Sequence, residues 1–194
     1  MKKLLYYVGL VSLVMTIYGC AVPVPKMNHS MVARAVTSPD PGKALIIFMR
    51  PNGVAFNTHV IVYHNDTLVG TVPYNSKLAY MVNPGKHIFM AISEAADFMQ
   101  ADLVAGKTYY AQLVPRMGWW RARFSFRAIS KNDLQTEEVK KWIADSQFVK
   151  NAGSLYKWDE VHRANVNLKR EKYFPEWDAK DESEKPTLRQ DDGE

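Results

Sequence analysis

The chain has 194 residues with a hydrophobic share of 47% and a charged share of 23%, which is typical of a folded globular protein and excludes a wholly disordered or collagen-like chain. The net charge is +5, but the basic excess lies within residues 20–130, whereas residues 131–194 are mildly acidic. A single cysteine, Cys20, excludes an intramolecular disulfide and a cysteine-based zinc cluster. The length indicates one domain of ordinary size with additional segments.

The beginning of the chain has the pattern of a secretory signal peptide. Lys2 and Lys3 precede an apolar run over 4–18, and a small residue stands before Cys20. This run is too short to cross a bilayer comfortably, because a membrane-spanning helix needs about 20 apolar residues. We therefore predict that residues 1–19 form a signal peptide that directs export.

The stretch Ile17-Tyr18-Gly19-Cys20 resembles a bacterial lipobox, in which an aliphatic and a small residue precede a cysteine that receives diacylglycerol. The resemblance implies a mature protein that begins at Cys20 and carries fatty acyl chains such as palmitate, which anchor it to a membrane. Ala21 stands where an inner-membrane retention signal has aspartate, which implies the outer membrane, facing the periplasm. The alternatives are a free cysteine at the end of a transmembrane anchor and a catalytic thiol, although the latter needs a base and a shaped pocket around it.

Residues 20–42 have the composition of a tether. They contain four prolines and no sustained hydrophobic period. Fully extended, such a segment reaches at most about 70 Å. We expect it to connect the lipid anchor to a globular body.

Residues 43–130 alternate between short apolar runs and turn signals, which predicts strands. The run 44–50 is apolar throughout and is typical of a strand buried on both faces. Asn65-Asp66 predicts a hairpin. The predicted strands are 44–50, 58–64, 67–72, 77–83, 86–93, 97–103, 107–114 and 119–129. This pattern predicts a mainly β fold, a small antiparallel β-sandwich followed by two C-terminal α-helices.

The last predicted strand has two different faces. Its even positions include Phe124 and Phe126, whereas its odd positions carry three arginines. Guanidinium groups bind phosphates and carboxylates in a bidentate manner, and aromatic neighbours add stacking. The candidate ligand or partner contacts are Arg116, Trp119, Arg121, Arg123 and Arg127. The alternative is a strand face that is only solvated or that pairs with the acidic C-terminal helices.

After Ser130 the hydrophobic period changes to that of helices. Thr136 is the expected N-cap of the first helix, and a second helix is expected to start near Gly153 and to end before Pro175. The residues expected on the buried helix faces are Val139, Trp142, Ile143 and Val149, then Leu155, Trp158, Val161 and Leu168. We predict a helical extension over 131–178 and a disordered charged tail over 179–194.

Several short motifs within 65–113 carry a resemblance to known families. They are "LVGTVP", "NPGKH" and "AGKTYY", preceded by an apolar strand that ends in Arg50-Pro51. The pattern resembles PEGA-type surface β domains, and also a family of bacterial lipoproteins that share a domain of unknown function. The resemblance implies an envelope-anchored β domain without an assigned activity.

Motifs that would indicate catalysis or cofactor binding are absent from the sequence. The "AGKT" stretch lacks the first glycine of a phosphate-binding loop, because Ala101 stands there. His59 and His64 point to opposite faces of one strand, and no histidine pair has the spacing of a metal site. No serine lies in a nucleophile elbow. We therefore expect no cofactor, no metal and no enzymatic activity.

Two hypotheses for the function follow. The first is a non-enzymatic envelope lipoprotein that acts as an interaction or structural module on other envelope proteins. The second is a binding module for an anionic envelope ligand, such as a glycan or lipid headgroup, through the strand face of Arg121, Arg123 and Arg127. A hydrolase with a dispersed site is a third, weaker alternative, and export argues against nucleic acid as a partner.

Overall fold

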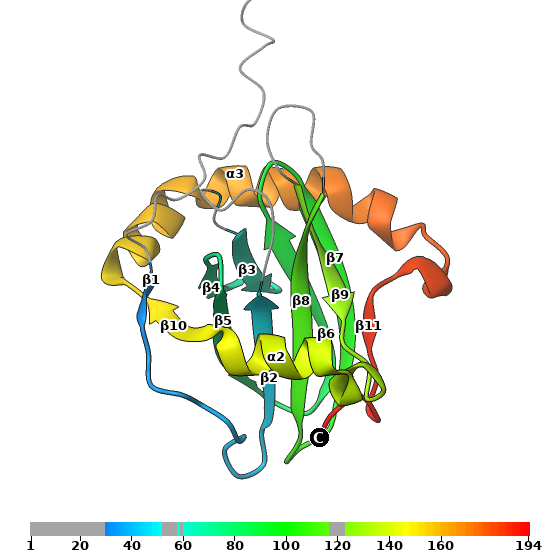
Figure 1. Ribbon diagram of the computed structural model, residues 1–194. Coiled ribbons are helices and arrows are strands. Elements are labelled where there is room, and N and C mark those ends of the chain that lie inside the picture. Colours follow the sequence, from blue (N-terminus) through cyan, green and yellow to red (C-terminus); the bar gives the residue numbers. More distant parts are fainter. Residues whose placement is uncertain (1–29, 52–57, 59, 117–122) are drawn as a thin grey trace, which may run out of the picture.

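The computed structural model describes residues 30–51, 58, 60–116 and 123–194, which form two β-sheets and two α-helices (Figure 1). In spatial order, the first sheet contains β1 (Ser30–Val32), β10 (Gln147–Asn151), β5 (Ser76–Val82), β2 (Ala44–Arg50), β8 (Thr108–Arg116) and β9 (Arg123–Ala128). The second sheet contains β11 (Thr187–Leu188), β7 (Ala96–Leu103), β6 (Gly85–Ile92), β3 (Val60–His64) and β4 (Thr67–Val72). The helices are α2 (Glu137–Asp145) and α3 (Gly153–Asp178), with short 3₁₀ turns η2 (Asp133–Gln135) and η3 (Glu182–Glu184).

The inner faces of the two sheets share one apolar core. Alternate residues of β2 and β3, such as Phe48 and Val62, point into it. The rings of Phe48 and Phe89 meet edge to face, with centroids 5.2 Å apart. All residues of β2 are buried, as the continuous apolar run predicted. The prediction of a mainly β, sandwich-like fold is confirmed.

The prediction of an antiparallel sandwich is wrong in part, because the sheets are mixed. The pairs β2–β8, β10–β5 and β11–β7 are parallel. After β2 the chain forms the β3–β4 hairpin in the second sheet and returns to the first sheet at β5. Parallel neighbouring strands need such long crossover connections. Side chains alternate with a period of two residues in parallel and antiparallel strands alike, so the sequence pattern contains no information on strand direction.

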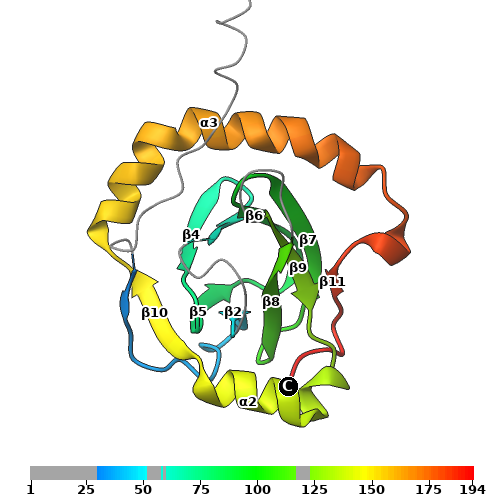
Figure 2. The ribbon, with the colours of Figure 1, turned by 45° about the horizontal axis from the view of Figure 1, so that its top comes forward.

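The helices cover the outer faces of the sandwich (Figure 2). In α2, Trp142 packs in one apolar cluster with Ile47 of the first sheet. In α3, Val166 and Trp177 pack in another cluster with Phe98 of the second sheet. The fold therefore has four layers, with one helix, two sheets and the second helix. Within the described part of the chain, neither helix has the length and hydrophobicity needed to traverse a bilayer.

The first helix begins as predicted, but it is shorter than expected. Thr136 is its N-cap, because its side chain accepts a hydrogen bond from the Val139 amide. The helix ends at Asp145, so Val149 lies in β10 and not on the helix. The sequence analysis missed β10, because its short apolar content also fits a continued helix.

The second helix extends beyond its predicted end and buries a different face. It continues through Pro175 to Asp178. Val161 and Leu168 were expected to be buried but are 74% and 47% exposed. Asp159 and Lys169 are buried instead, and Lys169 Nζ donates to the carbonyl oxygens of Ser93 and Glu94 at 2.6 and 2.7 Å. Buried charges of this kind cannot be predicted from hydrophobic periodicity, because their burial depends on partners elsewhere in the chain.

The two ends of the described chain are packed against the body. In the predicted disordered tail, Leu188 of β11 is fully buried, and Glu194 exchanges two backbone hydrogen bonds with Thr108 at 2.8 and 3.1 Å. In the predicted tether, β1 pairs with β10, and Val36 packs against the cluster of α2. The structure therefore corrects both predictions, although residues 1–29, including Cys20, lie outside the described residues.

Candidate functional site

A cavity of about 300 Å³ lies where the two sheets meet the end of α3. Arg116 of β8 and Arg123 of β9 line it, together with the aromatic side chains of Phe124, Tyr173 and Trp177. Two of the five arginine and tryptophan side chains predicted as contacts are thus brought to one cavity.

Arg116 and Arg123 lie directly opposite each other in the β8–β9 ladder. Like charges at opposite positions repel each other, so each guanidinium needs a compensating charge. Arg116 Nη2 lies 3.7 Å from Asp97 Oδ1, and Arg123 Nη2 lies 3.5 Å from Glu94 Oε1. Both are long, half-exposed ion pairs, which typically contribute about 0–1 kcal/mol.

Asp97 fixes the geometry of this corner. It is buried, and its Oδ2 accepts a hydrogen bond of 3.0 Å from the backbone amide of Phe126. Because Asp97 belongs to β7 and Phe126 to the edge strand β9, this bond joins the second sheet to the first. The same carboxylate therefore positions β9 and faces Arg116.

Two hydrogen-bond donors on the cavity residues have no acceptor among the described residues. Arg123 Nε and Trp177 Nε1 are both buried and make no hydrogen bond within the described chain. Leaving a buried donor unsatisfied costs about 1–3 kcal/mol. Both residues line the cavity, so an acceptor oxygen bound there would lie next to donors that no group of the described residues uses.

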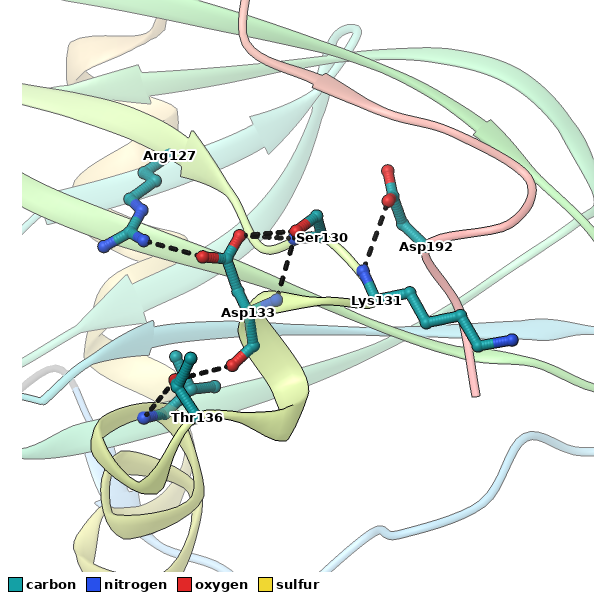
Figure 3. A network of polar contacts seen from close by, with 7 residues as sticks. Arg127, Ser130, Lys131, Asp133, Thr136 and Asp192 are labelled. Atoms are coloured by element: carbon teal, nitrogen blue, oxygen red, sulfur yellow. Dashed lines mark hydrogen bonds and ion pairs between the residues drawn. The ribbon is translucent and has the colours of Figure 1, made fainter.

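Arg127 has a different environment from the cavity arginines. Its Nη2 lies 3.0 Å from Asp133 Oδ1, within a network that begins the helical extension (Figure 3). Asp133 also accepts hydrogen bonds from the Ser130 hydroxyl and amide at 2.7 and 3.0 Å, and the hydroxyl bond contributes most to a lowered pKa of Asp133. Arg127 therefore stabilises a turn, which agrees with the alternative of pairing with the C-terminal extension. Trp119 and Arg121 lie outside the described residues.

The sequence analysis missed a chain of polar rings at one end of the core. His64 Nε2 lies 3.0 Å from His87 Nδ1, and His64 Nδ1 lies 3.1 Å from the hydroxyl group of Tyr80. His87 Nε2 lies 2.8 Å from the carbonyl oxygen of Asn83, which only accepts, so this nitrogen carries a proton. When both histidines are neutral, the Tyr80 hydroxyl group therefore donates to His64 Nδ1, and His64 Nε2 donates to His87 Nδ1.

These residues come together through strand pairing within the second sheet and through packing of the two sheets. His64 and His87 lie on the neighbouring strands β3 and β6, while Tyr80 belongs to the opposite sheet. Burial lowers the pKa of His64, and the nearby His87 lowers it further. In the part of the chain that the structure describes, no group of three or more histidine, cysteine, aspartate or glutamate side chains has the geometry of a metal site.

Comparisons with protein-family models, curated proteins and solved structures found no match to this chain. The chemistry of the cavity is nevertheless specific. Its guanidinium groups and the nearby Lys180 suit a carboxylate or phosphate, while its aromatic rings suit an apolar face such as that of a sugar ring. Asp97 and Glu176 also line it and can accept hydrogen bonds from hydroxyl groups.

Proposed function

We propose that the protein is a non-enzymatic binding module of the bacterial cell envelope, held on a membrane by lipid at Cys20, which binds an anionic group of an envelope component beside Arg116 and Arg123. The observation that carries this proposal is that two residues lining one cavity, Arg123 and Trp177, each have a buried donor, Nε and Nε1, with no acceptor among the described residues. The lipobox resemblance supports the location, with the outer membrane facing the periplasm as the expected site.

The ligand class follows from the lining of the cavity. Arg116 and Arg123 hold their carboxylate partners only loosely, so an anion with better geometry can recruit their remaining N–H donors. The rings of Tyr173 and Trp177 favour a ligand with an apolar face next to its charge. A glycan unit or lipid headgroup that carries a carboxylate or phosphate fits both requirements.

The experiment uses the full-length lipidated protein in detergent micelles and two soluble probes. Glucosamine 1-phosphate supplies a phosphate on a sugar, and a disaccharide–peptide fragment of peptidoglycan supplies carboxylates. Binding is followed by the NMR signal of the Trp177 indole N–H, which should move on saturation with at least one probe. Arg123→Gln should weaken that binding at least tenfold, because it removes the guanidinium that lines the cavity.

Arg127→Gln is the matched control, because it removes the same charge from the same strand but from the network of Figure 3. It should leave the affinity unchanged. The proposal is wrong if neither probe moves the Trp177 signal, or if both substitutions weaken binding equally.

The other expected function, a module that docks on envelope proteins, is favoured by a different surface. Val161 and Leu168 lie two turns apart on the solvent side of α3 and are exposed. Val161→Asp with Leu168→Asp should abolish recovery of a specific cross-linked partner from membranes, whereas Arg123→Gln should not. If Arg123→Gln abolished recovery of the cross-linked partner and the α3 substitutions did not, the cavity and not the exposed face of α3 would be the docking surface.

A further inference from the structure

The position of β1 limits how far the folded body can lie from Cys20. Nine residues, 21–29, separate Cys20 from Ser30, the first residue of β1. Ten residue steps span at most about 36 Å when fully extended. This is about half of the reach expected from residues 20–42. The edge of the body that carries β1 is therefore the part attached most directly to the lipid site.

This edge exposes apolar side chains. Met31 and Val32 of β1 are 53% and 65% exposed, and Tyr156 in the first turns of α3 is 57% exposed. The strand and the helix adjoin through Asn151, which pairs with Ser30 and lies 3.5 Å from the Tyr156 hydroxyl group. Edge strands of folded proteins usually carry charges that discourage association, so the two exposed apolar side chains of β1 are unusual.

The charges on the two segments that form this edge have a single sign, and the first exposed acid of α3, Glu160, lies one turn beyond Tyr156. Arg34, Lys150 and Lys157 are exposed, and Lys150 pairs with Met31 across the β1–β10 ladder. The segments 30–36 and 147–157 contain no aspartate or glutamate. Tyrosine beside apolar residues and flexible cations is the composition of surfaces that lie at the level of lipid headgroups.

We propose that this edge, formed by Met31, Val32, Arg34, Lys150, Tyr156 and Lys157, rests on the headgroups of the bilayer that holds the lipid of Cys20. The inference depends on the lipid attachment in the proposed function and adds an orientation to it. The occupant of the edge is the membrane surface itself, because the attachment keeps this edge within about 36 Å of the lipid and its apolar, tyrosine and cationic side chains suit the headgroup layer. The apolar side chains enter the headgroup layer, and the three cations face anionic phosphates.

The test uses full-length lipidated protein in vesicles of phosphatidylethanolamine and phosphatidylglycerol at a ratio of about 3:1. Lipidation occupies the sulfur of the only native cysteine, so one introduced cysteine can carry a fluorophore. The labelled variants are Met31→Cys and Tyr156→Cys at the proposed contact. Lys131→Cys is the control, since it follows β9 at the other edge of the first sheet, about 24 Å across five strand spacings.

Spin-labelled headgroup lipids should quench the labels at Met31→Cys and Tyr156→Cys at least threefold more than the label at Lys131→Cys. Adding Lys150→Glu and Lys157→Glu should reduce this difference, because the charge attraction is reversed. Circular dichroism confirms that each variant is folded.

The outcomes separate the two proposals. If metabolic labelling with a fatty-acid probe leaves the chain unlabelled, the lipid attachment is wrong and the orientation falls with it. If the chain is lipidated but all three positions are quenched equally, the lipid attachment stands and the proposed orientation is wrong.

Discussion

The carboxylate of Asp159 in α3 accepts a hydrogen bond of 2.6 Å from the hydroxyl group of Tyr63 in β3. Tyr63 is fully buried, and Asp159 is nearly so. Burial, followed by the hydrogen bond to Asp159, raises the pKa of Tyr63, so the phenol keeps its proton and donates it. Arg163 pairs with the same carboxylate. This contact joins the outer helix to the second sheet and explains why a charged residue occupies the buried face of α3.

Tyr63→Phe should lower the free energy of unfolding by about 1–3 kcal/mol, because Asp159 remains buried after losing one of its two hydrogen-bond donors among the described residues. Chemical denaturation followed by circular dichroism measures the change. Tyr74→Phe is the matched control, since Tyr74 is exposed in the turn between β4 and β5, and it should change stability by less than about 0.5 kcal/mol. Equal effects of the two substitutions would show that the buried bond contributes nothing.

Leu188→Ala should lower the free energy of unfolding by about 2–5 kcal/mol, because Leu188 of β11 is fully buried in the central core. Leu168→Ala removes the same atoms from the exposed side of α3 and should have an effect below about 0.5 kcal/mol. Thermal denaturation of both variants checks the difference. A negligible effect of Leu188→Ala would instead support the disordered tail that was predicted from the composition of 179–194.

Gly70→Ala should also destabilise the fold, by about 1–3 kcal/mol, because there is no room for a methyl group. A Cβ atom at Gly70 would overlap Oδ1 of Asn151 and lie 2.8 Å from Leu78 Cδ2. Asn151 also donates a hydrogen bond of 2.9 Å to the Val69 carbonyl oxygen, so its displacement would loosen β10 from β4.

Gly153→Ala is the control for this glycine, because a Cβ atom there would meet nothing within 4 Å at the start of α3. It should be neutral or stabilise the protein by up to about 1 kcal/mol, since alanine restricts the unfolded chain. If Gly70→Ala were equally well tolerated, β10 would not pack as closely as the structure describes.

The strands β2 to β9 were predictable because each carries its own local signal, whereas β1, β10 and β11 are short, have no such signal and were not predicted. Alternation placed Phe124 and Phe126 in the core, and the apolar run of β2 predicted its burial on both faces. Strand direction and the buried face of α3 depend on distant partners. Asp159 is buried because Tyr63 donates to it, and nothing near Asp159 in the sequence indicates that contact.

The candidate site was predictable only in part for the same reason. Arg123 was recognised from the alternation of the last predicted strand, and Arg116 was added as a nearby arginine before that strand. The pairing of β8 with β9 places the two residues opposite each other. Trp177 and Lys180 reach the same cavity from the far end of α3, which the sequence pattern ended before Pro175. Arg127 lies on the same strand as Arg123, but Asp133 holds it in another network.

The chain of His64, His87 and Tyr80 predicts that stability depends on pH. Burial lowers the pKa of His64 below its ordinary value of 6.5, and the neighbouring His87 lowers it further. The unfolded chain therefore binds a proton at this histidine more readily than the folded chain does. The contribution of His64 to stability is complete above about pH 6.5 and is lost progressively as the pH falls below that value.

Denaturation of the native protein at pH 7.5 and at pH 5.5 should therefore show a lower free energy of unfolding at the more acidic pH. His64→Gln should reduce this pH dependence, because glutamine keeps polar atoms near Tyr80 and His87 but does not titrate. His162→Gln removes a histidine of α3 that contacts the carbonyl oxygen and the ring of Trp158, and it should keep the native pH dependence. If the unfolding free energy of His64→Gln depended on pH as steeply as that of the native protein, the acid sensitivity would arise from groups other than His64.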